Sequence, residues 1–263
     1  MGVVKMRIKQ ERGFTIVELL TAMVVTSFLL MAIYLAVNTT QRDSTAIERK
    51  VVAQADAKSA LDIMALEIGM ASYNANFEIE AWPAPGNSVS TCAALGADQK
   101  LRGIRVATAN TIVVAMDAND SCKNVSPPSG CVGDGPNEII RYDYNVITGA
   151  DRYITRETDC GGGQPFLGDS IASGRPRNVI VNNADLDPVI PLFRYFDGSG
   201  NELIPGTATL TGTARRLNNA TIPDIRRIEI TLAVLTADPD TQGVRRQLFY
   251  STSVIPRNHA ITP

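Results

Sequence analysis

The chain has 263 residues, of which 44% are hydrophobic and 20% are charged, and its formal net charge is −2. This small negative charge excludes the basic surface typical of nucleic-acid-binding proteins. Beyond residue 72 about 190 residues remain, which is enough to build a sizeable core of their own. Length and composition therefore fit one globular domain with a distinctive N-terminal segment.

The N-terminal segment is a basic leader, residues 1–13, followed by an apolar stretch, residues 14–37. The leader contains one acidic residue, Glu11, and four basic residues: Lys5, Arg7, Lys9 and Arg12. At about 1.5 Å per residue, a helix over 14–37 reaches about 36 Å, which exceeds the roughly 30 Å of a bilayer core. Positive charge before an apolar helix keeps that end in the cytoplasm. No second apolar run approaches 18 residues, so we expect a single pass.

The apolar stretch contains one charged residue, Glu18. A lone carboxylate at the centre of a bilayer costs about 2.5–3.5 kcal/mol, so Glu18 is a functional candidate. Either Glu18 pairs with a cation in an assembled protein, or the segment does not lie in a membrane. The plainest alternative is a signal anchor that is never processed.

The stretch Gly13-Phe14-Thr15-Ile16-Val17-Glu18-Leu19-Leu20 resembles the prepilin cleavage and methylation motif of type IV pilins and type II secretion pseudopilins. The resemblance implies that a prepilin peptidase cuts after Gly13 and methylates the new amine of Phe14. It also implies that Glu18 pairs with the N-terminal amine of a neighbouring subunit, which supplies the partner that a buried carboxylate requires. Removing the leader's four basic residues and one acidic residue would change the net charge from −2 to −5.

The resemblance and the residue patterns together divide the chain into a leader (1–13), a transmembrane or filament-core helix (14–37), a helix extension (38–72) and a periplasmic β-rich head (73–263). Five apolar residues of the first helix are expected to pack against neighbouring helices: Ile16, Leu19, Leu20, Met23 and Leu30. We expect one continuous helix from Phe14 to about Ala71, because no proline occurs before Pro83. The expected fold class is α+β, with the long helix packed on an antiparallel β-rich head.

The helix extension carries an apolar stripe at spacings of three and four residues: Ala53, Ala57, Leu61, Met64 and Ile68. This spacing predicts one helix face that docks on a sheet. The charged residues Glu48, Lys58 and Asp62 lie on the opposite face. The stripe is therefore interpreted as core packing rather than as a ligand site.

After Pro83 the pattern predicts strands. Two β-hairpins are expected, one from residues 103–108 and 111–117 and one from 138–144 and 152–157. Shorter strands are expected at 178–182 and 192–196. The clearest alternation places Ile228, Ile230, Leu232 and Val234 on one face, and the strand at 245–255 should pair with it.

The four cysteines, Cys92, Cys122, Cys131 and Cys160, all follow the apolar segment. In an oxidising compartment they would form disulfides, and three pairings are possible. We favour Cys122–Cys131 with Cys92–Cys160. A metal site built from all four thiolates is the alternative, but it needs close cysteine pairs that the chain lacks.

No cofactor and no catalytic residue is predicted, and the chain is expected not to be an enzyme. The only histidine, His259, lies near the C-terminus, where we expect a frayed end rather than a rigid pocket. Asp238 and Asp240 begin a loop that partly matches a calcium-binding pattern, and an ordinary Asp-rich turn is the alternative. These two residues are the only weak metal candidates that we retain.

Three functional classes stay open. The overall length, the four-cysteine β-rich head and the ending Pro256-Arg257-Asn258 are similar to the PilW family of minor pilins, which implies a subunit that primes type IV pilus assembly. The J-type pseudopilin of type II secretion is the first alternative. A membrane-anchored binding or adhesion protein that never assembles is the second. For a minor pilin, the expected partners are other minor and major pilins, the prepilin peptidase and the inner-membrane assembly platform, with no nucleic acid. Such a protein starts in the bacterial inner membrane, with its head in the periplasm, and ends in the pilus tip at the cell surface.

Overall fold

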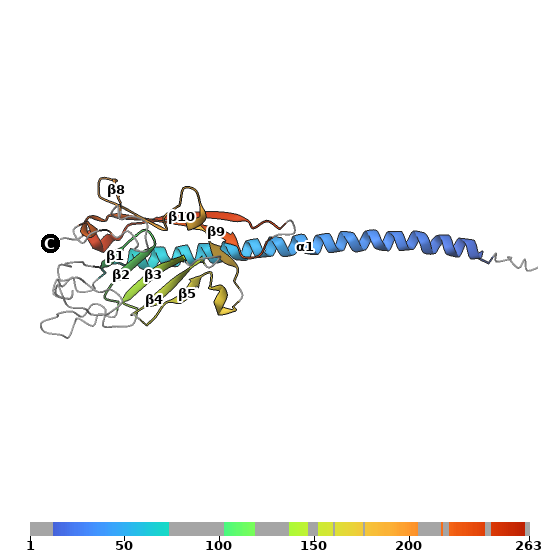
Figure 1. Cartoon of the computed structure of the whole chain (residues 1–263), viewed down its shortest axis with the longest axis horizontal. Helices are drawn as coiled ribbons and strands as arrows, with labels where there is room; N and C mark the ends of the chain where they lie inside the picture. The colour runs from blue at the N-terminus through green and yellow to red at the C-terminus, as the bar shows by residue number, and fades with distance from the viewer. Residues whose placement is uncertain are drawn as a thin grey trace, which may run out of the picture. The chain divides into compact units, whose positions relative to one another are not determined.

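The computed structural model describes residues 13–73, 103–118, 137–146, 152–159, 161–175, 177–204, 217, 221–239 and 243–260. The four cysteines, residues 1–12 of the leader and Asp240 lie outside these ranges, so the disulfide pairing stays a prediction. The chain divides into two compact units, residues 1–48 and residues 49–263 (Figure 1). We call the second unit the head.

One helix, α1 (Ile16–Gly69), contributes to both units. Its bounds agree with the predicted helix to within about two residues at each end, the usual uncertainty of helix termini. The whole predicted stripe is buried, and Ala60 joins it. Just past the helix Ser72 takes a positive φ of 65°, which ends the helical path.

The first sheet of the head is antiparallel and has the order β1-β2-β3-β4-β5. Its strands are β1 (Ile104–Ala107), β2 (Thr111–Ala115), β3 (Ile139–Val146), β4 (Arg152–Thr158) and β5 (Gln164–Leu167). Both predicted hairpins are confirmed, since β1 pairs with β2 and β3 with β4. The short edge strand β5 was not predicted, because Pro165 weakens a strand pattern and is tolerated only at an edge.

The second sheet has the order β10-β9-β7-β8, and β6 also pairs with β9. Its strands are β6 (Val179–Val181), β7 (Phe193–Phe196), β8 (Glu202–Leu203), β9 (Arg227–Thr236) and β10 (Gln247–Val254). The predicted alternation is confirmed, because Ile228, Ile230, Leu232 and Val234 are all fully buried. Four short 3-10 helices complete the described part of the head: η4 (Ile171–Ser173), η5 (Asn183–Asp185), η6 (Ile222–Asp224) and η7 (Arg257–Ala260).

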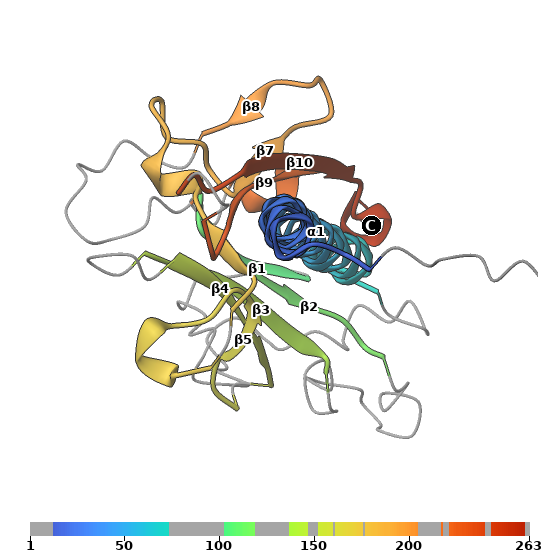
Figure 2. The same cartoon turned by 90° about the vertical axis from the view of Figure 1, so that its right-hand side faces the viewer.

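The head part of α1 lies between the two sheets, as the view along the helix shows (Figure 2). The stripe and the inner faces of both sheets form one hydrophobic cluster. Polar contacts fix the helix on the first sheet: Arg156 donates two hydrogen bonds to Glu67, at 3.1 and 2.7 Å, and the Tyr142 hydroxyl donates a third. The hydrogen bonds and the charge of Glu67 raise the pKa of Arg156. The predicted α+β layout is therefore confirmed.

The expectation of a frayed C-terminus around His259 is wrong. His259 lies in η7 and is buried, with its Nδ1 3.0 Å from the Ser72 hydroxyl and its Nε2 2.9 Å from the Ile222 carbonyl oxygen. Because Ser72 lies three residues after the end of α1, this histidine connects η7 to the segment that follows the helix. Sequence reasoning missed it because both partners are distant in the chain.

The stripe should carry much of the head's stability. Met64 is fully buried, so Met64→Ala is expected to lower the free energy of unfolding by about 2–5 kcal/mol. Its neighbour Ile63 is 39% exposed and serves as the matched control, for which Ile63→Ala should cost about 0.5 kcal/mol. Urea denaturation of the full-length chain in detergent, followed by near-ultraviolet circular dichroism, measures both. Equal costs would contradict the burial of the stripe.

The helix end should not tolerate a side chain at Gly103. This glycine has a φ of +73°, and an added Cβ would lie 1.9 Å from the Ser72 hydroxyl oxygen and 2.2 Å from the Ser72 nitrogen. Gly103→Ala is therefore expected to destabilise the head by about 1–3 kcal/mol. Gly162 also has a positive φ, +96°, but open space around it, so Gly162→Ala separates backbone strain from the clash. The same denaturation measurement should show the larger loss at Gly103.

Candidate assembly site at the start of the first helix

The first turn of α1 is closed by a reciprocal pair, Thr15 and Glu18. The Glu18 backbone nitrogen donates to the Thr15 hydroxyl oxygen at 3.2 Å, while the Thr15 nitrogen and hydroxyl both donate to Glu18 Oε2 at 2.9 Å. This is a capping box, in which the residue before the helix and the third helical residue satisfy each other's polar groups. It explains why the helix begins at Ile16.

Thr15 was not among the residues that sequence reasoning singled out. The signal was available, because a threonine followed three residues later by glutamate and then an apolar run is the sequence signature of a capping box. The box holds Glu18 on the first turn and leaves room for another donor. Both Thr15 bonds go to Oε2, so Oε1 of the carboxylate can still accept from a cation such as an amine.

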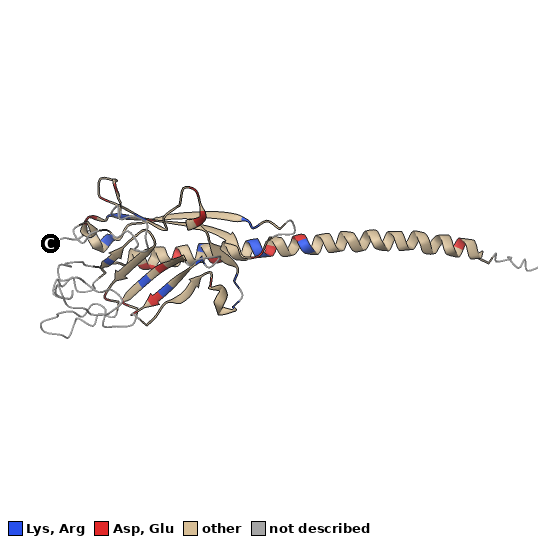
Figure 3. Cartoon of the chain, viewed as in Figure 1, with Lys and Arg blue, Asp and Glu red and all other residues tan. Residues whose placement is uncertain are grey.

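The rest of this helix half exposes apolar side chains on all sides. The exposed fraction is 79% for Ile16 and between 58% and 62% for the other four packing candidates, Leu19, Leu20, Met23 and Leu30. Within the described residues α1 is long and apolar enough to cross a membrane. After Glu18 no charged residue occurs until Arg42, and this part of the helix is an unbroken tan stretch in Figure 3.

The hydroxyl groups in this apolar stretch bond within the helix. Thr21, Thr26 and Ser27 each donate to the carbonyl oxygen four residues earlier, at 3.1, 2.7 and 2.8 Å. A polar group in lipid must find such an internal partner, because no water is present to replace it. Apart from the Glu18 carboxylate, the surface of this stretch therefore suits hydrocarbon or the apolar side of another helix.

The other candidate residues do not form a site in the part of the chain that the structure describes. Asp238 is exposed, and one of its carboxylate oxygens lies 3.6 Å from Arg49 Nε. No group of three or more potential metal ligands occurs among the described residues. Asp238 therefore gives no support to the predicted calcium loop. The second candidate, Asp240, lies outside the described ranges.

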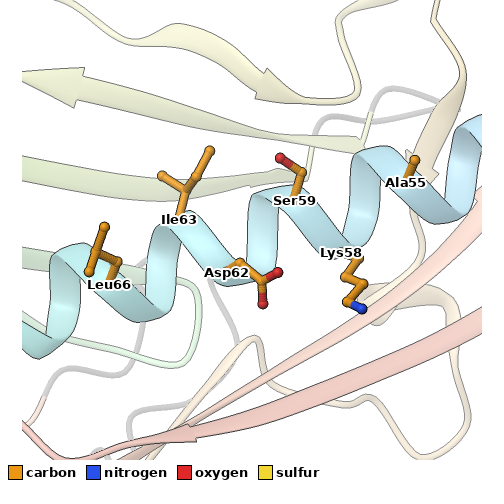
Figure 4. A pocket seen from close by; sticks show the side chains of 6 residues that line it. All are labelled: Ala55, Lys58, Ser59, Asp62, Ile63 and Leu66. Carbon is orange, nitrogen blue, oxygen red and sulfur yellow. The ribbon is translucent and has the colours of Figure 1, made fainter.

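A shallow pocket follows the exposed side of α1 within the head (Figure 4). All its lining residues come from this one helix: Ala55, Lys58, Ser59, Asp62, Ile63 and Leu66. They combine aliphatic side chains with one lysine and one aspartate a helical turn apart. This arrangement is a helix surface and offers no nucleophile with an adjacent base.

Comparison with known proteins identifies the N-terminal segment only. Residues 8–34 match the family model described as the prokaryotic N-terminal methylation motif. No curated protein and no solved structure is significantly similar to the chain. The match covers the predicted cleavage position, the capping box and most of the exposed apolar surface. Together with the long apolar helix, it supports a type IV pilin-like protein, a pilin or pseudopilin that is a substrate of prepilin peptidase and assembles with other pilins.

Proposed function

We propose that this chain is a minor pilin, a structural subunit that primes assembly of a type IV pilus. The observation that carries the proposal is the exposed apolar surface of α1 with Glu18 as its only charge. The head forms its own compact unit from residue 49 onward. The side chains of residues 14–37 are exposed, so this surface can face lipid first and other subunits afterwards.

Assembly follows from the chemistry of the N-terminus. The leader holds the precursor in the inner membrane, and cleavage after Gly13 creates the amine of Phe14, which the peptidase methylates. This ammonium group pairs with the Glu18 carboxylate of a neighbour. The ion pair is favourable because either charge alone is costly in lipid. Thr15 keeps the carboxylate fixed on Oε2 while Oε1 accepts the incoming amine. The neighbouring helices then pack through Ile16, Leu19, Leu20, Met23 and Leu30.

The size of the head favours a minor pilin over the abundant major pilin of a filament. The head contains two five-stranded sheets around one helix, and about 190 residues follow residue 72. Glu18 is retained, so this subunit still has the acceptor that pairs with a neighbour. No metal, cofactor or catalytic step is part of the proposed role, in which the chain acts as a structural component.

Deleting the gene distinguishes a pilus subunit from a secretion subunit. We expect surface pili to fall to a small fraction of the wild-type number, while release of secreted proteins is unchanged. Electron microscopy of cells and an assay of proteins in the culture medium measure the two outcomes. Normal piliation with impaired protein release would assign the chain to type II secretion instead.

Glu18→Ala should block incorporation without blocking processing. The alanine chain is expected to lose its leader, because the cut lies five residues away, but to be depleted at least about tenfold from purified filaments, as a loss of about 1.4 kcal/mol predicts. Thr21→Ala is the matched control, since it also removes a polar side chain from the same helix and should be incorporated normally.

Mass spectrometry of both variants checks the N-terminus, which should begin at methylated Phe14. A chain that functions normally with Glu18→Ala would point to an anchored protein that does not assemble.

A further inference from the structure

The outer edge of the second sheet is formed by β10, and it lacks the usual protection of an edge strand. The strand Gln247–Val254 contains no charged residue and no proline, and it pairs with β9 without a bulge. Natural proteins usually block such an edge with charges, prolines or bulges, because an open edge invites another strand. An unprotected edge of eight residues is therefore a candidate for strand addition.

The hydrogen-bond pattern shows which residues of β10 face outward. The Thr236 nitrogen donates to the Arg246 carbonyl oxygen at 3.1 Å, which makes these two residues a hydrogen-bonded pair. Such pairs alternate along an antiparallel ladder, so the residues that bond to β9 are Leu248, Tyr250, Thr252 and Val254. The intervening residues direct their backbone N–H and C=O groups away from β9: Gln247, Phe249, Ser251 and Ser253.

These outward residues also expose their side chains, and Phe249 is 55% exposed. No described residue forms a hydrogen bond with their backbone groups. The other face of β10 packs inward, where Val254 is buried. The edge thus presents a regular row of donors and acceptors on a strand that the core holds in place.

The charges at the two ends of β10 indicate the kind of partner. Arg246 precedes the strand, Arg257 follows it, and both are exposed. Two copies of β10 paired antiparallel would bring the start of one strand, which Arg246 precedes, near the end of the other, which Arg257 follows, and a parallel pair would align identical arginines. Like charges across a strand pair are unfavourable, so a second copy is a poor occupant.

We propose that the outer edge of β10 receives an extended segment of a different pilin-type subunit, with an uncharged centre and acidic residues at its ends. Main-chain hydrogen bonds to Gln247, Phe249, Ser251 and Ser253 supply the affinity, and the positive charge at both ends of the strand favours acidic residues over a basic segment. This partner class rests on the proposed function, because the anchored helices would hold the heads of one filament side by side. The contact differs from helix packing, since it connects heads.

Ser251→Pro tests the strand contact, because it removes an N–H that the ladder to β9 does not use. Ser251→Val is the matched control: it also lacks the hydroxyl, which lies 3.2 Å from Thr231 Oγ1, but it keeps the N–H. Both are made in the full-length chain, in cells that assemble the filament, with a photo-reactive phenylalanine analogue at position 249. Crosslinked peptides are identified by mass spectrometry.

We expect a crosslink to an acidic-ended segment of another pilin-type subunit. Its yield should fall about fivefold to tenfold with Ser251→Pro and stay within about twofold with Ser251→Val. Thermal unfolding of the full-length variants verifies that the head stays folded, and Ser253→Pro replaces Ser251→Pro if it does not. A crosslink within the same chain or to a second copy, equal effects of both substitutions, or no crosslink from a processed and incorporated chain would each overturn the strand contact. A wild-type chain that is never processed would instead overturn the proposed function, and the partner class with it.

Discussion

The burial of one helix stripe between two sheets is the constraint on which the rest of the head depends. Ala53, Ala57, Leu61, Met64 and Ile68 supply the middle layer of the core, and each sheet covers the helix from one side. Burial of apolar area is the main stabilising term in such a core. Small residues at 53, 57 and 60 let both sheets approach the helix closely. Glu67, held by Arg156 and Tyr142, then fixes how the helix is rotated against the first sheet.

The same helix meets two different requirements along its length. Residues 16–37 must suit an apolar environment on every side, so their polar hydroxyls turn back to the helix backbone. Residues 49–69 need only one apolar face and can carry charge on the other. Glu18 is the exception, because its carboxylate is costly in an apolar environment. The hydrogen bond from Thr15 lowers this cost. The Glu18 carboxylate has hydrogen-bond donors from its own chain on only one of its two oxygens, so it is well suited to bind a cation from another subunit.

Regular patterns in the sequence were sufficient for the layout. The three- and four-residue spacing of the stripe and the two-residue alternation of β9 both correspond to buried faces in the structure. These signals are local, since each depends on the geometry of a single element. The same reasoning located Glu18, because one charge in an apolar run is visible without any tertiary contact.

What the sequence did not reveal depends on contacts between distant residues. The pairing register of β1 and β2 shifts between Ile104 and Val106, and Arg105 is buried at this shift, where burial lowers its pKa to about 10. His259 is fixed by Ser72 and Ile222, which are far from it in the chain. The two-residue strand β8 exists only because β7 lies beside it. No local pattern encodes such features.

The head part of α1 packs against β9 and β10, which are made last, and this order has a consequence for biosynthesis. The stripe is made first, yet its cover includes β9 and β10, which come from the last fifth of the chain. Contacts between residues so far apart close slowly, because a long loop must be ordered before they form. The apolar stripe of the newly made helix therefore stays exposed until translation is nearly finished. A polypeptide that terminates before β9 would leave the apolar stripe exposed to solvent.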